Sequence, residues 1–472
     1  MKAEREMVPK PPSGVPRFVD AIVVLAIVWL RLPAAFGIAP PTSIRILALI
    51  PLLVGVVVLL PLKRPVGKTS MLGVLVALFV LIVIVSIFRG ESAGAYETFH
   101  QVIYDAVGIC LLAGLGYLYF ATALNVAERE RRLFILCCAP GAYVAINVAL
   151  HLGGIKVATS AGEPTTVLNA GTPAELLGLF GIHSTRVLFP FADGVNNFGD
   201  IAGVALVTST ILALRTTGPA RRYPIVLLLA ALYGLFATDA RGALLSSLGA
   251  TALILVLGRR RVVAGIAIFV PFTTAIVRFV LGIVASTSLV GTFSREGDNL
   301  LTASNRTVIW NAVDNFLTSS SPSQLYGYGA NGQISSGASL GYEHLFAAAA
   351  HPSQYTAHNF MLQTVLDTGY IGLLVFVLLL YLAARRLQRV VALHDSIGSR
   401  ALLGVLIFVV FAGATDSTPM IYTPETLYFF LLIVTCAAAV RVASERRRPR
   451  SRQAANQYIR ATTRPPKTYQ KI

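Results

Sequence analysis

The sequence predicts an all-α protein that crosses a membrane about twelve times. Hydrophobic residues fill 55% of its 472 positions and charged residues only 13%, whereas soluble domains carry roughly 25% charged residues. Many apolar runs approach the roughly 20 residues that a helix needs to cross a bilayer. These runs lack the alternation of polar and apolar residues that marks the strands of a membrane barrel. A polytopic α-helical membrane protein is therefore expected.

Twelve apolar segments qualify as membrane spans, and the charge of their connections gives their orientation. Lys and Arg gather in every second connection, as in "KRPVGK" at 63–68, "ERERR" at 128–132 and "ARRLQR" at 384–389. Cytoplasmic loops of membrane proteins carry this excess. Both termini are therefore predicted to be cytoplasmic. The spans cover residues 18–38, 45–62, 70–88, 104–124, 133–153, 196–214, 223–238, 242–258, 262–284, 359–383, 400–415 and 425–441.

This topology divides the chain into five parts. A cytoplasmic N-terminal tail covers 1–17, and the first nine spans cover 18–284 with an outward loop at 154–195. A second outward loop covers 285–358, and the last three spans cover 359–441. The remaining part, 442–472, is expected to be a disordered cytoplasmic tail. A loop as long as the second one is uncommon in a compact protein and usually carries function.

The C-terminal tail is strongly basic. From Arg441 onward it holds ten Lys and Arg residues against one acid, Glu445, in a chain of net charge +17. Such a run directly after a last span favours attraction to anionic membrane lipids, worth about 1 kcal/mol per basic residue near the surface. No nucleic-acid partner is predicted. The N-terminus lacks the small-residue cleavage site of a signal peptide, so the first span is expected to remain as an anchor.

One segment of the second outward loop has helical periodicity. In "SNRTVIWNAVDNFL", Ile309, Val313 and Phe316 share one face and Trp310 lies beside them. Ser304 or Asn305 is placed to cap its start. A short amphipathic helix that carries a Trp typically lies along a membrane surface, so this one is predicted to lie over the span ends.

Arg241 stands where the topology leaves few basic residues, at the outer start of a span. An arginine within a span costs roughly 3 kcal/mol on insertion scales, so its presence requires a reason. The sequence alone leaves two interpretations of Arg241 open. The side chain pairs with Asp239 at the membrane interface, or it binds an anion. In the second case, Gly242 gives a ligand close access and the helix dipole favours phosphate.

Two other arginines face outward near spans. Arg306 begins the predicted loop helix, and Arg186 precedes a span that opens with Asn196 and Asn197. Each alone also fits a solvated loop charge. Together with Arg241 they are placed to converge on one anion, and a guanidinium stays charged and grips phosphate oxygens through two donors.

His358 lies where the second outward loop meets the tenth span. It either caps that helix by bonding a loop carbonyl, or acts as a general base, since an imidazole titrates near neutral pH. Asn359 is placed to orient it or to bind a sugar. His344 and His351 share the loop, but their spacing of seven matches no common metal-ligand pattern. No phosphate-binding Gly-rich loop is visible. We therefore expect neither a metal nor another cofactor.

The stretch "HNFMLQTVLDTGYIG" at 358–372 resembles the signature of the O-antigen ligase and polymerase superfamily. That signature has a His, a polar residue, nine further residues and two glycines, here His358, Asn359, Gly369 and Gly372. "ARGA" around Arg241, "NRTVIW" from 305 and "FADGVNNFGDIAG" from 191 are also similar to family segments. The resemblance extends over roughly 180–375, with about twelve spans and a large outward loop before the histidine.

The resemblance implies a glycosyltransferase of GT-C type in the bacterial cytoplasmic membrane. Family members transfer a glycan from a polyprenyl-diphosphate carrier to an acceptor hydroxyl on the outer face, with inversion and without a metal. It implies that the outward loop orders over the sugars. His358, Arg241 and Arg306 would be catalytic, and Gly369 and Gly372 would let their helix pack closely. The substrate-binding residues would be Arg186, Asn197, Asn359 and Trp310.

Other functions share parts of this pattern. A polysaccharide polymerase and a protein O-oligosaccharyltransferase carry the same histidine motif, so the acceptor is a glycan, a lipid or a protein. Twelve spans with both ends inside are also a common plan for transporters and lipid-sugar flippases. Those proteins usually have a cytoplasmic mid-chain loop and charges near the midplane. The late outward loop and the rim position of these residues favour the enzyme. No sequence feature supports a receptor or scaffold.

Overall fold

The computed structural model describes twelve stretches of the chain, and all regular structure in them is helical. They are 17–31, 42–62, 70–94, 99–123, 125–155, 187–192, 194–258, 262–285, 306–319, 321–346, 356–419 and 424–439. Most of the predicted tail 1–17, all of the predicted tail 442–472 and most of the loop at 154–195 lie outside these stretches; Arg17 is described and begins a helix. The all-α fold class is confirmed.

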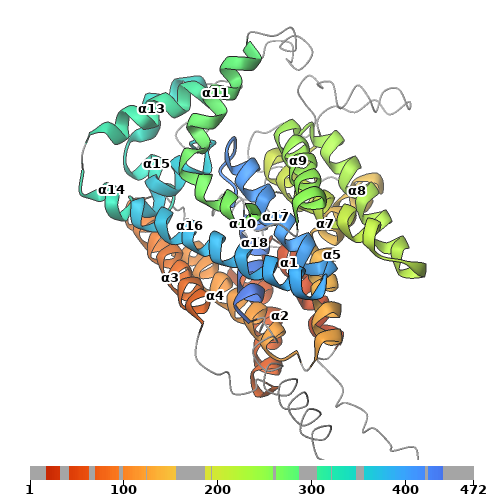
Figure 1. The fold of residues 1–472 in the computed structure, drawn as a ribbon. Helices are drawn as coiled ribbons and strands as arrows, with labels where there is room; N and C mark the ends of the chain where they lie inside the picture. Colours follow the sequence, from red (N-terminus) through yellow and green to blue (C-terminus); the bar gives the residue numbers. More distant parts are fainter. Residues whose placement is uncertain are drawn as a thin grey trace, which may run out of the picture. The chain divides into compact units, whose positions relative to one another are not determined.

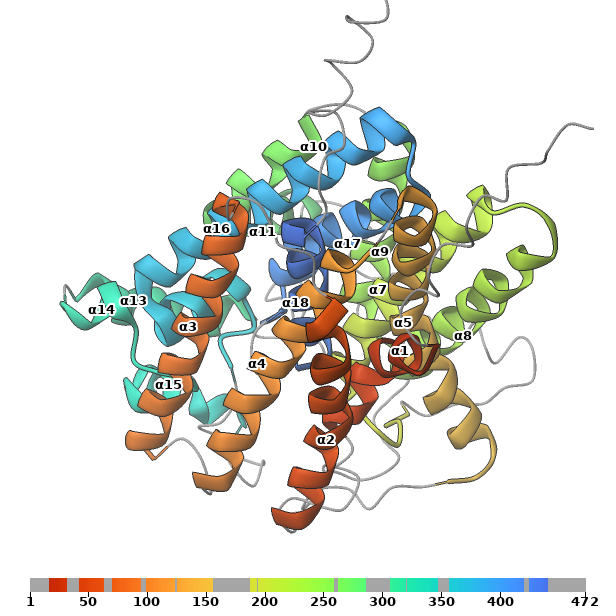
Figure 2. The ribbon, with the colours of Figure 1, turned by 90° about the horizontal axis from the view of Figure 1, so that it is seen from below.

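Each of the twelve predicted spans coincides with helical structure (Figures 1 and 2). Eight helical stretches among the described residues are long and apolar enough to cross a membrane. The count of twelve and the orientation stay predictions. The helices are α1 (Arg17–Arg31), α2 (Thr42–Leu59), α3 (Met71–Ser92), α4 (Phe99–Ala121), α5 (Val126–Leu152), α7 (Val195–Arg215), α8 (Arg222–Thr238), α9 (Arg241–Leu257), α10 (Val262–Gly265), η4 (Ile266–Phe272), α11 (Thr273–Ala285), α16 (Phe360–His394), α17 (Ile397–Gly413) and α18 (Pro424–Ala439).

The structure corrects one predicted loop and the continuity of one predicted span. The "ARRLQR" connection at 384–389 is not a loop, because α16 continues to His394. Leu387 and Val391 on this extension are buried while Arg385 and Arg389 are exposed, so amphipathic packing sustains the helix. The predicted span 262–284 is one path in three pieces, α10, η4 and α11, and Pro271 lies within the 3₁₀ piece η4. A proline removes one helical hydrogen bond and so favours such a break.

The most deeply buried helices are α7, α17 and α18. Nearly every residue of α7 from Phe198 to Ala213 is buried, and α5, α8, α9 and α17 pack around it. Small residues permit the contact. A Cβ at Gly203 would lie 2.6 Å from the Phe408 ring of α17, and one at Gly199 would lie 2.3 Å from the Ala240 Cβ. In lipid, close packing of this kind drives helix association. Elsewhere α4 packs between α2 and α3 (Figure 2).

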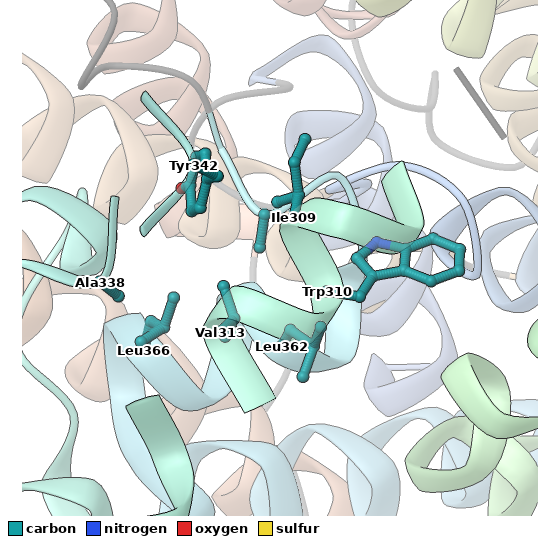
Figure 3. Packing of buried hydrophobic residues seen from close by; sticks show 8 residues of the cluster. Ile309, Trp310, Val313, Ala338, Tyr342, Leu362 and Leu366 are labelled. Atoms are coloured by element: carbon teal, nitrogen blue, oxygen red, sulfur yellow. The ribbon is translucent and has the colours of Figure 1, made fainter. Parts of the chain in front are cut away.

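The described parts 306–319 and 321–346 of the second predicted outward loop are largely helical. Its predicted helix exists as α13 (Arg306–Thr318), and four short helical turns follow that the sequence did not predict: α14 (Ser323–Tyr326), α15 (Gly332–Ser335), η6 (Ala338–Gly341) and η7 (Glu343–Phe346). Ile309, Trp310 and Val313 of α13 join Tyr342, Leu362 and Leu366 in one hydrophobic cluster (Figure 3). The apolar face of α13 is thus covered by α16 and η6 and not by a membrane surface.

Gly369 breaks α16 and seats the loop against it. Its φ of 74° is unfavourable for a residue with a side chain, and a Cβ there would lie 2.3 Å from the Leu325 carbonyl oxygen. The loop backbone bonds carbonyl groups that the break leaves available: Tyr328 N–H donates to Leu366 and Gly329 N–H donates to Asp367. The glycine was predicted to allow close packing; what it packs against is α14.

Candidate functional site

His358 lies at the start of α16 in a backbone conformation that its surroundings impose. Its φ is 46°, in the left-handed region that residues with a side chain rarely adopt. The Trp310 indole donates to the His358 carbonyl at 3.3 Å. The His358 N–H points to the Thr356 hydroxyl at 3.4 Å. Strained residues persist only where neighbours over-determine them, and they cluster at functional sites.

The residues on either side of His358 are also fixed. Asn359 is fully buried; its side-chain oxygen caps α16 by accepting from Leu362 N–H, and its amide donates to the Ala414 carbonyl at 2.8 Å. The Gln363 side chain accepts from Ala357 N–H at 2.9 Å. Of the two roles open for Asn359, orientation of the histidine and sugar binding, these contacts favour the first.

Asp416 brings His358 and Arg306 together. It lies in the turn after α17, where its Oδ1 is 3.8 Å from His358 Nδ1 and its Oδ2 is 3.7 Å from Arg306 Nη2. All three side chains are mostly buried yet keep some exposure. Both distances exceed hydrogen-bond length, and catalytic hydrogen bonds often tighten only when substrate binds. A carboxylate facing Nδ1 favours the tautomer with the proton on Nδ1 and the lone pair on Nε2.

The electrostatics of this group favour an ionised carboxylate. Burial alone would raise the pKa of the Asp416 carboxyl. The His358 imidazole and the Arg306 guanidinium outweigh that effect, helped by the Ser417 N–H, and hold the pKa below its usual value of 3.8. Asp416 therefore stays negative at neutral pH and is placed to stabilise a positive charge on His358.

Arg241 begins α9 next to the same turn. Its Nε and Nη2 reach the two oxygens of Asp239 at 3.2 and 3.4 Å, so the pair expected as one reading exists. Asp239 is only 1% exposed and caps the end of α8 in a left-handed conformation. A Cβ at Gly242 would lie 3.5 Å from the Thr415 hydroxyl, which places the start of α9 beside the residue before Asp416. The pairing orients Arg241 and leaves its anion-binding role open.

The other predicted site residues occupy different environments. Trp310 is completely buried and reaches His358 only through the backbone carbonyl, so it supports the histidine. Asn197 is half-buried in the first turn of α7. A Cβ at Gly372 would lie 2.0 Å from the Thr368 hydroxyl, so the close neighbour there belongs to α16 itself. Arg186, and the predicted caps Ser304 and Asn305, lie outside the described residues.

Sequence reasoning missed the acidic member of the site. Asp416 opens the short connection "DSTPMIYTPET", directly after a predicted span. A signal was present: the chain has only 22 acidic residues, and the predicted topology puts this one on the same side as the candidate arginines. The fold is needed to bring α17 beside the start of α16. The described residues contain no group of three His, Cys, Asp or Glu side chains arranged to hold a metal ion.

Comparison with family models supports the expected resemblance. Residues 225–377 match the model described as O-antigen ligase. The match is less than half of the chain; it runs from α8 to the middle of α16 and contains Arg241, Arg306, Trp310, His358 and Asn359. Asp416 lies beyond it. Comparison with curated proteins gives no match.

Proposed function

We propose that the chain transfers a glycan from a polyprenyl-diphosphate carrier to an acceptor hydroxyl. Two findings support this: residues 225–377 match the family model described as O-antigen ligase, and the described residues include helices long and apolar enough to cross a membrane. The observation that carries the proposal is the meeting of His358 and Arg306 at Asp416, beside the helix start that holds Arg241. It joins a base and an anion-binding group at one place.

The acceptor is activated by His358. With Nδ1 facing Asp416, Nε2 takes the proton of the incoming hydroxyl as its oxygen attacks the anomeric carbon. The carboxylate of Asp416 stabilises the imidazolium that forms. Attack opposite the departing diphosphate inverts the configuration at that carbon. Trp310 and Asn359 fix the strained backbone of His358. The imidazole ring is therefore already oriented before the reaction, so no conformational entropy is lost when the transition state forms.

The donor is bound through its diphosphate. Negative charge grows on the leaving lipid diphosphate as the glycosidic bond breaks, and arginines aimed at that charge stabilise the transition state. Arg306 and Arg241 supply the positive charge that a divalent cation would otherwise provide. Arg186 is a third predicted donor. Asp239 keeps Arg241 directed, since the side chain is otherwise flexible. Both arginines face the outer side in the topology predicted from charge.

The proposal is tested with purified protein in lipid vesicles and a polyprenyl-diphosphate glycan as donor. Formation of glycosylated acceptor and free lipid diphosphate without added metal, and with a chelator present, is expected. Absence of both products with glycan, lipid and protein acceptors alike would overturn it. Mass spectrometry of envelope glycans from a deletion strain separates the reactions. Accumulated long carrier-linked chains indicate a ligase, and accumulated single repeat units indicate a polymerase.

The orientation is tested by labelling a cysteine placed in the outward loop. Leu340 is 68% exposed on η6, so L340C should react with a membrane-impermeant maleimide on intact cells. The unmodified chain is the matched control because Cys110 is itself exposed in the structure. Reaction of L340C only after permeabilisation would place the site on the cytoplasmic side and contradict the proposed localisation.

A further inference from the structure

The turn that carries Asp416 is hydrogen-bonded to two different elements, the start of α16 and helix α7. From the histidine side, the Asn359 amide donates to the Ala414 carbonyl at 2.8 Å, and the Ser417 hydroxyl donates to that of Thr356 at 2.9 Å. From the opposite side, the Thr418 hydroxyl donates to Asp200 Oδ2 at 2.5 Å. The first two bonds fix the turn to the start of α16. The third fixes it to α7.

Asp200 lies in the second turn of α7 and is only 3% exposed. The Thr426 hydroxyl lies 3.3 Å from that of Thr418, and Asp416, Arg306 and Glu425 are near enough to interact with Asp200 electrostatically. Burial of an ionisable side chain in a membrane helix is costly, so its presence there calls for a specific role. The mechanism above assigns it none.

The packing of α7 gives Asp200 a connection to the donor side of the site. Gly199, the residue before it, has no room for a Cβ because the Ala240 Cβ would lie 2.3 Å away. Ala240 immediately precedes Arg241. The start of α7 and the start of α9 are therefore packed as one unit, and the Thr418–Asp200 hydrogen bond attaches the Asp416 turn to that unit.

We propose that Asp200, acting through Thr418, is a positioning residue that sets the distance between the acceptor-activating pair, His358 and Asp416, and the diphosphate-binding Arg241. The inference rests on the proposed function. When this hydrogen bond is lost, the turn keeps its hydrogen bonds to the start of α16 but no longer has the one to α7. The hydroxyl that His358 activates then approaches the anomeric carbon from a less defined position, while donor contacts stay intact. A misplacement of about 1 Å costs roughly a hundredfold in rate.

The experiment compares paired substitutions on the two sides of the bond. Asp200→Ala and Thr418→Val remove it, whereas Asp200→Asn keeps an acceptor oxygen and Thr418→Ser keeps the hydroxyl. We expect kcat to fall about ten- to a hundredfold in the first two, with the donor KM changed less than about twofold, and near-normal kcat in the other two. Thr208→Val is the matched control, since Thr208 is buried in α7 and its hydroxyl donates to the Ala205 carbonyl of the same helix.

The outcomes separate this inference from the proposed function. An unmodified chain that transfers no glycan contradicts the proposed function itself. Transfer by the unmodified chain, together with full kcat in Thr418→Val, overturns the positioning role, even if Asp200→Ala fails to fold. An Asp200→Asn variant as slow as Asp200→Ala overturns it too, because the carboxyl group itself, and not a hydrogen-bond acceptor at that position, would then be required. A parallel loss of kcat in Asp200→Ala and Thr418→Val, restored by Asn and Ser, supports it.

Discussion

Two charged clusters in this protein differ in how closely their members approach. In the Asp20 cluster (Asp20, Tyr119, Glu128, Arg131 and Arg132), Arg131 Nη1 and the Tyr119 hydroxyl each lie 2.6 Å from an Asp20 oxygen. Arg132 is fully buried, bonds the Tyr119 carbonyl and the Thr122 hydroxyl, and pairs with Glu128. In the Asp416 cluster (Arg306, His358 and Asp416), the closest charged atoms are 3.7 and 3.8 Å apart.

The difference indicates which cluster holds the fold and which is arranged for a ligand. The close contacts of the Asp20 cluster join α1, α4 and α5, and each charged side chain in it pairs with one of opposite charge. In the Asp416 cluster the charged groups face one another at distances longer than a hydrogen bond. Hydrogen bonds from the Trp310 and Asn359 side chains hold the backbone of this cluster in place. Substitutions in the first should therefore change stability, and substitutions in the second should change activity.

The largest effect is expected for His358→Ala. Loss of a general base lowers the rate by about 10²–10⁴-fold, so transfer should fall within that range while the protein inserts and binds the carrier normally. Turnover with a purified lipid-linked donor measures it. His344→Ala is the matched control, because His344 is exposed and precedes His358 in the same predicted loop. Wild-type turnover in the His358 variant would refute its role as base.

Arg132→Ala tests the other cluster. Removing one member of a buried ion pair leaves an uncompensated charge and costs about 3–5 kcal/mol, so thermal unfolding in detergent should occur at a markedly lower temperature. Turnover per folded molecule should be unchanged. Arg131→Ala should cost much less, since the Arg131 side chain is 44% exposed. If Arg132→Ala lost activity without losing stability, the contrast between the clusters would be wrong.

Arg241→Ala should weaken donor binding. A hydrogen bond to a charged group contributes roughly 1.5–3 kcal/mol, or about ten- to a hundredfold in affinity. The binding that remains should depend more steeply on salt. Titration of protein in vesicles with a lipid-diphosphate glycan measures both. Arg389→Ala changes an exposed arginine on the far part of α16 and serves as control. Equal donor affinity in the two variants would argue against a diphosphate contact at Arg241.

Trp310→Phe should have a small effect. Phenylalanine keeps most of the packing in the cluster but removes the hydrogen bond to the His358 carbonyl, worth about 1 kcal/mol. We expect kcat to fall a fewfold with the donor KM unchanged. A rise in donor KM with normal kcat would instead indicate that the indole contacts the substrate, as the family resemblance implied.

The smallest effect concerns stability at low pH. Because the folded-state pKa of Asp416 is lowered, its stabilising contribution is complete above the unfolded value near 3.8 and is lost as pH falls through the folded value. The wild-type protein should therefore unfold more easily with acid below that pH, and Asp416→Asn should show less of this dependence. An identical acid dependence in both chains would mean that Asp416 is not held ionised by His358 and Arg306.

The sequence predicted the helices well and the site only in part. Apolar length depends on local sequence, so each predicted segment overlaps helical structure in the described residues. The choice of His358, Arg241 and Arg306 stays a prediction. Asp416 and Asp200 were missed because their roles arise from packing between helices far apart in the chain. The sequence also did not show that protein, and not lipid, covers the apolar face of α13 around Trp310. Periodicity identifies an apolar face but not what covers it.

The break at Gly369 bears on how this protein can open and close. The carbonyl groups of Leu366 and Asp367 accept hydrogen bonds from the backbone N–H groups of Tyr328 and Gly329, in the segment 321–346. Separation of that segment from α16 would break both hydrogen bonds and leave the two carbonyl oxygens without these donors. The part of the chain around residues 325–332 is therefore scaffold and not a flap. We therefore expect any rearrangement that admits a substrate to occur in other regions, with α14 and the first half of α16 staying together.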